Sequence, residues 1–179
     1  MAKTNKDNNQ ADRVWGLARI GLGFIFLWAF VDKLVGLGFS TCRDAVSGSV
    51  EVMCERAWLN GGSPTGGFLQ FGTDGPFADF YQGLAGNALI DWLFMMGLLG
   101  IGLALILGIG MRIAVVSGVA MMLMMYTAAL PPENNPVVDD HIIYALVLIG
   151  LLRVNGSQAS GFGKSWAETD LVKRYPVLR

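Results

Sequence analysis

Long apolar runs that alternate with short polar segments are the main pattern along this chain. Four of the runs are close to the roughly 20 residues that an α-helix needs to cross a bilayer. They extend from Val14 to about Phe39, from Ala88 to Ile109, from Ile113 to Leu130, and from about Val137 to Val154. The pattern predicts an all-α polytopic membrane protein, an up-down bundle of four transmembrane helices.

The segments between the runs predict how the chain is organised. Only the tripeptide Gly110–Arg112 separates the second and third runs, so we expect a tight antiparallel hairpin there. We assign residues 1–12 to a disordered cytoplasmic N-terminus, residues 13–154 to one membrane domain, and residues 155–179 to a cytoplasmic tail. Within the membrane domain, residues 40–87 form an extracytoplasmic loop.

Composition agrees with a single membrane domain. Of the 179 residues, 53% are hydrophobic and 15% are charged, and the mean hydropathy is +0.49. This balance is too apolar for a soluble domain of this size. The first run is also too long for the apolar part of a cleaved signal peptide, so we expect it to be retained.

Lysine and arginine are distributed asymmetrically between the loops. Because cationic loops resist translocation, they mark the cytoplasmic side. With the N-terminus inside, only Arg43 and Arg56 lie in outer loops. The sequence therefore predicts a multi-pass protein of a prokaryotic plasma membrane, with both termini in the cytoplasm. We interpret three arginines near the inner face, Arg19, Arg112 and Arg153, as contacts to lipid phosphates.

Both cysteines, Cys42 and Cys54, fall in the predicted outer loop. An oxidising compartment makes a disulfide between them the expected state. A redox-active dithiol is the less favoured alternative, because the spacing is not the C-x-x-C of thiol oxidoreductases.

Two shorter patterns predict local packing. In "GPFADFYQGLAG", Pro76 precedes apolar residues at helical spacing, which favours a short helix in the membrane interface. In the second run, Gly100, Ala104 and Gly108 recur every four residues. Small residues at this spacing predict a groove in which another helix packs closely.

Ionisable and aromatic residues gather at one membrane face of the predicted bundle. An ionisable side chain in lipid costs at least a few kcal/mol, so each one needs a partner, water or a function. All four helices bring such residues to the outer face, where we predict a polar cavity. The candidate catalytic residues are Asp32, Asp140 and His141, and the candidate cofactor contacts are Trp28, Lys33, Asp91, Tyr126 and Tyr144.

The fourth run begins with titratable residues that suggest proton transfer. His141 is the chain's one histidine, and it shares a helix face with Tyr144, as does Asp140. Histidine titrates near neutral pH, and beside a carboxylate it can pass protons, as quinone reduction at the membrane edge requires.

Structural roles are the alternative for several of these residues. We favour such roles for Asp139 as a helix cap and for Asp91 among the lipid headgroups. Asp32 and Lys33 are adjacent, hence about 100° apart around a helix. We expect one of them to pair across the bundle and the other to reach toward water.

Four stretches carry a resemblance to a known family. They are "RIGLGFIFLWAFVDKLVGLGFST", "AWLNGGSPTGGFL", "DWLFMMGLLGIGLALILGIGMRIA" and "NNPVVDDHIIYALVLIGLL", which together span Arg19 to Leu152. With them, the chain resembles the DoxX/DoxD family of small four-helix membrane proteins, in particular the DoxD-like subunits of thiosulfate:quinone oxidoreductase.

The resemblance implies a membrane subunit that acts with a second protein subunit. Together they would oxidise thiosulfate, a small anionic sulfur substrate, and pass the electrons to a quinone of the menaquinone or ubiquinone type. Most carboxylates of the chain lie on the predicted outer face and repel an anion. We therefore expect the partner, Lys33, Arg43 or Arg56 to supply positive charge.

Whether the chain is itself an enzyme stays open at this stage. One alternative is a non-catalytic scaffold that anchors a redox or detoxifying enzyme through the outer loop. A transporter or proton channel is weaker, because no charge lies at mid-depth. Haem held by His141 and a methionine is a further open alternative. We expect contact with membrane lipid, and neither nucleic acid nor a metal ion as a ligand.

Overall fold

The structure is a computed structural model, and it describes residues 2–132, 135, 137–153 and 161–179. The helices are α1 (Ala2–Val35), η1 (Trp58–Asn60), α2 (Gly66–Phe71), α3 (Ala78–Gln82), α4 (Ala88–Leu107), α5 (Met111–Ala128), α6 (Asp140–Arg153), α7 (Gly163–Ala167), α8 (Asp170–Arg174) and η3 (Pro176–Leu178). The described residues form no β-strand, and Arg43 and Val50 make an isolated antiparallel bridge.

The prediction of an all-helical chain with helices of membrane type is confirmed. Within the described residues, three helices are long and apolar enough to cross a membrane: Gln10–Val35 of α1, and all of α4 and α5. They coincide with the first three apolar runs. The fourth run contains α6, which is shorter, at 14 residues.

The helix α1 differs from the prediction at both ends. The polar residues 2–12, which we expected to be disordered, already belong to α1. Polar residues extend an existing helix at little cost once the apolar span has nucleated it. At its other end α1 stops at Val35 and not near Phe39, because Gly36 takes a φ of +72°. That left-handed conformation favours glycine and ends a helix.

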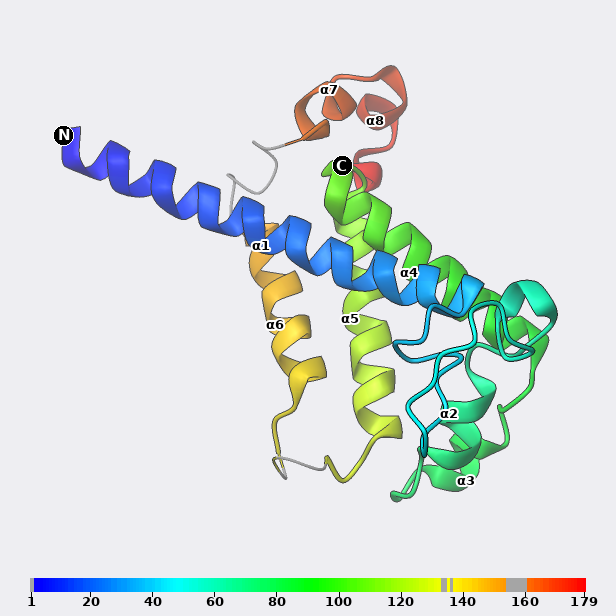
Figure 1. The fold of residues 1–179 in the computed structure, drawn as a ribbon. Coiled ribbons are helices and arrows are strands. Elements are labelled where there is room, and N and C mark those ends of the chain that lie inside the picture. The colour runs from blue at the N-terminus through cyan, green and yellow to red at the C-terminus, as the bar shows by residue number, and fades with distance from the viewer. Residues whose placement is uncertain (1, 133–134, 136, 154–160) are drawn as a thin grey trace.

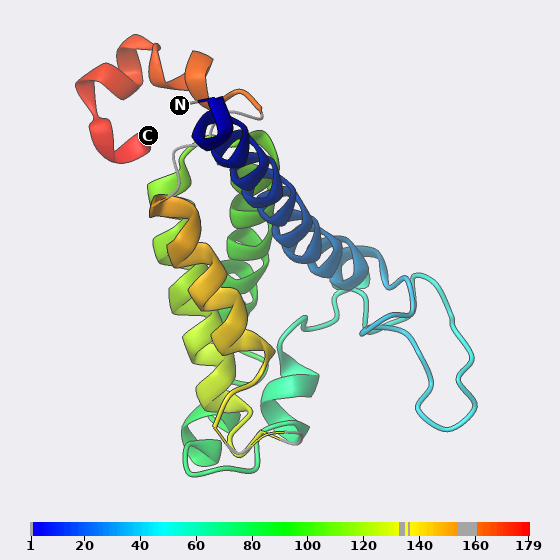
Figure 2. The same ribbon diagram turned by 90° about the vertical axis from the view of Figure 1, so that its left-hand side faces the viewer.

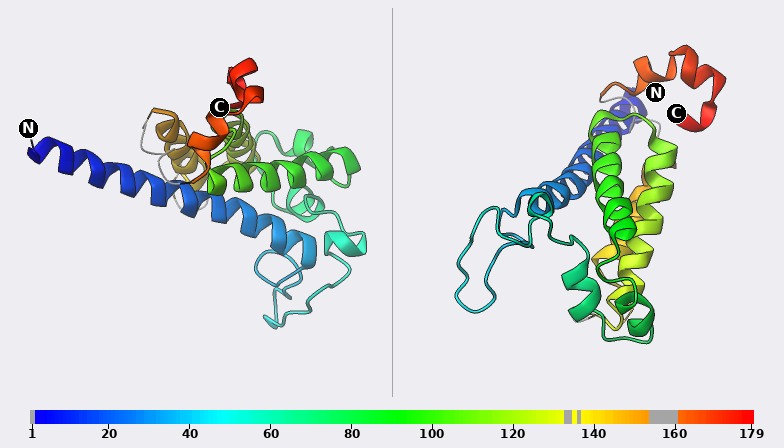
Figure 3. Two further views of the ribbon diagram at one scale, coloured as in Figure 1. Left: turned by 90° about the horizontal axis from the view of Figure 1, so that it is seen from above. Right: turned by 90° about the vertical axis from the view of Figure 1, so that its right-hand side faces the viewer.

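The long helices are arranged as two packed pairs (Figure 1). In one pair α1 packs on α4, and in the other α5 packs on α6. The predicted hairpin is confirmed, since α4 and α5 are joined by three residues, of which Gly108 and Gly110 have positive φ. Figure 2 and Figure 3 show that α1 runs obliquely to α5 and α6. Apolar side chains such as Phe26, Met95 and Leu148 fill the core between the helices.

Glycines bring α1 and α4 together, but not those that the sequence pattern indicated. A Cβ atom on Gly102 would lie 2.9 Å from the backbone nitrogen of Leu27, and one on Gly23 would lie 3.0 Å from that of Ile106. Around Gly100, by contrast, a Cβ would meet nothing within 4 Å. The predicted groove through Gly100 is therefore wrong, because two residues correspond to about 200° around a helix.

The two ends of the helix assembly carry different structures. At one end, called the loop end, α1 and α5 finish and α4 and α6 begin, and residues 36–87 fold over it. The predicted disulfide is present in this segment, with Cys42 and Cys54 joined and their Cα atoms 5.7 Å apart. The predicted short helix after Pro76 is also present, as α3.

At the opposite end, called the tail end, residues 161–179 pack on the ends of α4 and α5. The amide of Phe162 donates to the carbonyl of Leu107 (2.9 Å), and the amide of Arg112 donates to the carbonyl of Arg179 (3.1 Å). Arg19 is completely buried here, with its guanidinium against Gly108. The prediction that Arg19 contacts lipid phosphate is wrong, because the end of α4 and the tail cover it.

Candidate functional site

The carboxylate of Asp32 holds the segment that follows α1. It is only 1% exposed. The amide of Phe39 donates to Oδ1 (3.0 Å), while the amides of Ser40 and Thr41 donate to Oδ2 (2.8 and 3.1 Å). The hydroxyl of Ser40 also donates to Oδ2 (2.7 Å), which makes four bonds to the carboxylate. Charge-assisted bonds of this kind allow a carboxylate to be buried, so Asp32 anchors residues 39–41 on the end of α1.

Lys33 turns toward the same segment. Its Nζ donates to the hydroxyl of Ser40 (3.0 Å), and it lies over the ring of Phe94, 6.0 Å from the centroid. Asp32 and Lys33 thus both contact Ser40. Across the bundle Lys33 faces Phe94 of α4, while Asp32 takes its partners from the segment that turns back over the end of α1.

The two arginines of the loop between α1 and α4 bind loop backbone. Arg43 Nε donates to the carbonyl of Gly38 (2.6 Å), and Arg56 Nη2 donates to the carbonyl of Arg43 (3.0 Å). These bonds brace the disulfide-closed segment. Lys33, Arg43 and Arg56 thus each donate to an atom of the segment that follows α1.

Asp91, in the first turn of α4, anchors a second part of the outer loop. It is 6% exposed, so its side chain is buried against the protein and is not exposed as a group among the headgroups would be. Its Oδ1 accepts bonds from the hydroxyl of Ser63 (2.9 Å) and from the amide and hydroxyl of Thr65 (3.1 and 2.6 Å). The motif "GGSPTGGFL" therefore folds back onto the start of α4, as the glycines around it permit.

A cavity of about 260 Å³ opens beside this carboxylate. We call it the tryptophan pocket, because Trp58 and Trp92 form two of its walls, with their ring centroids 4.7 Å apart and an interplanar angle of 73°. Asp91, Ser63, Ala88 and three glycines complete the lining. Of the predicted candidates, only Asp91 borders this cavity.

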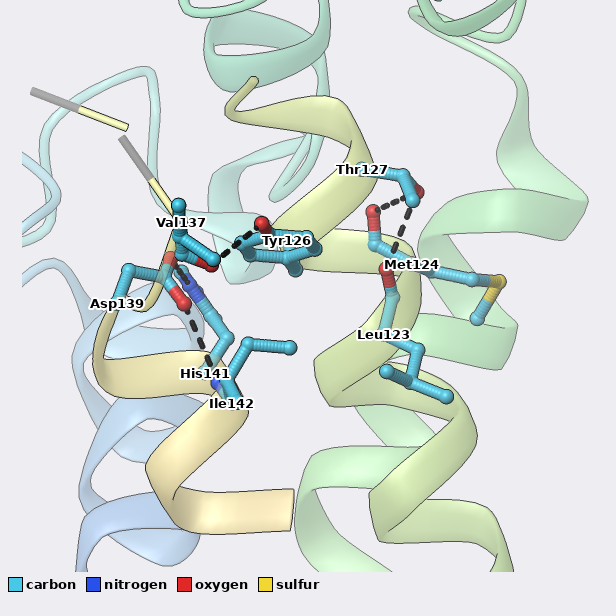
Figure 4. Close-up of polar contacts among 8 residues, drawn as sticks. All are labelled: Leu123, Met124, Tyr126, Thr127, Val137, Asp139, His141 and Ile142. Carbon is cyan, nitrogen blue, oxygen red and sulfur yellow. Dashed lines mark hydrogen bonds and ion pairs between the residues drawn. The ribbon is translucent and has the colours of Figure 1, made fainter. Parts of the chain in front are cut away.

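His141 and Asp139 form a close pair at the start of α6 (Figure 4). His141 Nδ1 lies 2.6 Å from Asp139 Oδ2, and the two side chains are 23% and 16% exposed. The amide of Ile142 donates to Asp139 Oδ1 (3.2 Å), which confirms the predicted cap.

One of the predicted aromatic residues, Tyr126, lies beside the Asp139–His141 pair. The hydroxyl of Tyr126, near the end of α5, donates to the carbonyl of Val137 (2.8 Å), and Figure 4 shows this ring beside Asp139 and His141. Tyr144 lies one turn further along α6 and packs against the core. Asp140 is exposed, and His141 pairs with Asp139 in its place.

The structure divides the candidates among separate networks. Asp32 and Lys33 bind residues 39–41, Asp91 binds residues 63–65, and His141 binds Asp139. Trp28 stacks on Phe24, with ring centroids 5.8 Å apart, and it meets Phe39 edge to face at 5.1 Å, so it lies against the network of Asp32. Among the described residues, no hydrogen bond or ion pair joins one of these networks to another. Within the described residues, hydrogen bonds and ion pairs therefore do not join all eight candidates in one network.

Sequence reasoning missed the partners of Asp91. Trp58, Ser63 and Thr65 all lie within "AWLNGGSPTGGFL". An available signal was the pair of hydroxyl residues between two glycine pairs, since hydroxyls in a flexible backbone commonly satisfy a buried carboxylate. The stretch by itself does not predict which carboxylate accepts hydrogen bonds from Ser63 and Thr65.

Comparison with known proteins gives no relative. No protein-family model matches the chain, and neither a curated protein nor a solved structure matches it.

Proposed function

We propose that this chain is the membrane subunit of a quinone-linked oxidoreductase of the thiosulfate:quinone oxidoreductase type, related to the DoxX/DoxD family. The observation that carries the proposal is the Asp139–His141 pair, with Nδ1 and Oδ2 2.6 Å apart at the loop end. In the proposed topology the loop end is extracytoplasmic and both termini are cytoplasmic, in a prokaryotic plasma membrane.

The proposed architecture is a four-helix bundle in which α6 is the fourth span. Its surface supports this, because Ile143, Leu146, Ile149 and Leu152 are 44–59% exposed on one side, while Ala145, Leu148 and Leu151 are buried on the other. An apolar, exposed helix face is suited to lipid. A helix of 14 residues is about 21 Å long, and a span shorter than the roughly 30 Å core is accommodated by local thinning of the bilayer.

The pair has the geometry of an oriented proton carrier. When Nδ1 carries a proton it donates to Asp139, and Nε2 then remains as an acceptor or donor for a ligand or water. Asp139 also stabilises the protonated ring through its negative charge. Reduction of a quinone to a quinol takes up protons with electrons, so a group that exchanges protons beside the apolar spans serves this reaction.

In this proposal the quinone ring comes from the bilayer to the ends of α5 and α6. Tyr126 and Tyr144 offer aromatic contact on either side of His141, and a quinone supplies the two-electron chemistry when bound. The electrons come from a second subunit that oxidises thiosulfate. That partner also supplies the positive charge that thiosulfate needs, since Lys33, Arg43 and Arg56 are engaged with the loop.

The test is thiosulfate-dependent reduction of a quinone analogue by the purified protein with its partner subunit. We expect His141→Ala to lower the rate about 100-fold, the low end of what a positioned acid–base group contributes. Asp139→Asn keeps a capping side chain, so the helix should persist while the pH profile of the rate shifts. Asp79→Asn, an exposed carboxylate of α3, is the matched control. A wild-type pair of subunits that reduces no quinone contradicts the proposal.

A non-catalytic scaffold is the second candidate, and a specific observation favours it. Asp32 and Asp91 are both used to fix the outer loop, and its disulfide-closed segment presents Val46 at 98% exposure. A fixed loop with an exposed apolar tip suits the docking of a partner enzyme. If so, Val46→Asp releases the partner from the membrane, whereas His141→Ala leaves the activity of the complex unchanged. The opposite pattern excludes this alternative.

A further inference from the structure

The tryptophan pocket contains a charge that the fold leaves without a counter-ion. Asp91 is the one charged side chain among its lining residues. Its three hydrogen bonds all reach Oδ1, and no described residue donates to Oδ2 or forms an ion pair with the carboxylate. A buried carboxylate is most stable when a cation or a full set of donors compensates it. The pocket therefore offers a site of negative charge to a ligand.

The walls select the kind of cation. Trp58 and Trp92 meet edge to face, and Trp92 is 56% exposed, so indole surface is accessible to a ligand. Aromatic faces attract organic ammonium groups by cation–π contact, and tryptophan is the strongest of them. A bare metal ion would need several oxygen ligands, whereas the described residues contain no group of three or more potential metal-ligating side chains.

The other ligand classes fit less well. The carboxylate of Asp91 repels an anion. A quinone carbonyl and this carboxylate are both hydrogen-bond acceptors, so they do not bind one another. The volume of about 260 Å³ is below the roughly 300–1,000 Å³ of pockets for drug-sized molecules. A small headgroup-sized ligand therefore matches the space.

We propose that the tryptophan pocket binds an organic ammonium group, with Asp91 as its counter-ion and Trp58 and Trp92 as its aromatic walls. The pocket lies at the first turn of α4, where the apolar helix begins, which is the level at which lipid headgroups meet a membrane helix. The ammonium group belongs either to a phospholipid headgroup or to a free organic cation. This site is separate from the Asp139–His141 pair, so its test does not depend on quinone chemistry.

The experiment measures choline binding to the purified full chain in an uncharged detergent, from the choline methyl signal in ligand-observed NMR. We expect saturable binding, with 3,3-dimethylbutan-1-ol, the uncharged isostere of choline, bound about tenfold more weakly. Asp91→Asn, which keeps an acceptor for Ser63 and Thr65, should weaken choline binding by a similar factor. Asp79→Asn is the control and should bind as the wild type does.

A second variant separates loss of the site from loss of the fold. Ala88 is exposed at the pocket rim and makes none of the Asp91 bonds, so Ala88→Leu should block choline while the unfolding temperature stays unchanged. The proposal is overturned if the isostere binds as tightly as choline, or if Asp91→Asn and Ala88→Leu both retain wild-type affinity.

Lipid nanodiscs distinguish the two sources. If the ligand is a headgroup, choline binds in phosphatidylglycerol nanodiscs and is displaced in phosphatidylcholine or phosphatidylethanolamine nanodiscs. If the ligand is a free cation, choline binds equally in all three. Absence of choline binding in every nanodisc, with the protein folded, contradicts both forms of the proposal.

Discussion

At the scale of single residues, buried carboxylates connect the outer loop to the helices. Asp32 and Asp91 stand at the ends of α1 and α4, and each collects donors from a loop segment that lacks regular structure. A buried backbone N–H without a partner is costly, so the carboxylate and the loop amides stabilise one another. Together with the disulfide and the packing of Trp58 on the core, these side chains fix the conformation of residues 36–65.

Asp32→Asn tests this role. The amide nitrogen of asparagine would face donors from Ser40 and Thr41 in place of an acceptor oxygen, which leaves buried donors unpaired. We expect the free energy of unfolding to fall by about 1–3 kcal/mol, measured by circular dichroism during chemical unfolding in detergent.

The matched control for that measurement is Asp79→Asn, because Asp79 is exposed and its side chain makes no hydrogen bond among the described contacts. Surface changes of this kind usually alter stability by less than about 0.5 kcal/mol. Equal stability of the two variants would show that Asp32 is not an anchor.

At the scale of the helices, close approach of α1 to α4 depends on Gly23 and Gly102. Without a hydrophobic driving force in lipid, helix association relies on packing, and small residues allow the backbones to approach. A side chain on Gly102 would collide with backbone atoms of Leu27, which cannot move aside as a flexible side chain can.

Gly102→Leu should therefore separate the two helices. We expect a loss of about 1–3 kcal/mol in the free energy of unfolding, the usual cost of overpacking. The matched variant is Gly100→Leu, at an exposed position with open space around the Cβ. Both substitutions raise helix propensity by the same amount, so a stability difference between them reports packing alone. A wild-type stability for Gly102→Leu would contradict the assigned contact.

At the scale of the whole molecule, the number of spans decides on which side each end of the chain lies. With α6 as a fourth span, both termini lie on the same side of the membrane, and the positive-inside distribution makes this the cytoplasm. With three spans, the termini would lie on opposite sides.

Reporter fusions measure this difference. We expect alkaline phosphatase fused after Arg179 to be inactive, and green fluorescent protein at the same position to fluoresce, because the first needs an oxidising compartment and the second folds in the cytoplasm. The same fusions placed after Leu130, between α5 and α6, should give the reverse result. An active phosphatase after Arg179 would contradict the four-span proposal.

The sequence predicted those features that depend on neighbouring residues. Apolar runs gave the helices and the hairpin, the location of both cysteines gave the disulfide, and the position of Asp139 before an apolar run gave the cap of α6. Each of these follows from residues a few positions apart, or, for the cysteines, from a compartment inferred from charge.

What the sequence alone determined about this protein is thus where the long apolar helices lie and that they suit a membrane. The tertiary structure decided which partners the polar residues have: Asp91 is paired with Ser63 and Thr65, which lie 28 and 26 residues away, and His141 is paired with Asp139 and not with Asp140. It also decided that Gly102, and not Gly100, faces α1. The physical reason is that helix formation is a local and periodic property, whereas the partner of a buried charge depends on where the chain returns in space.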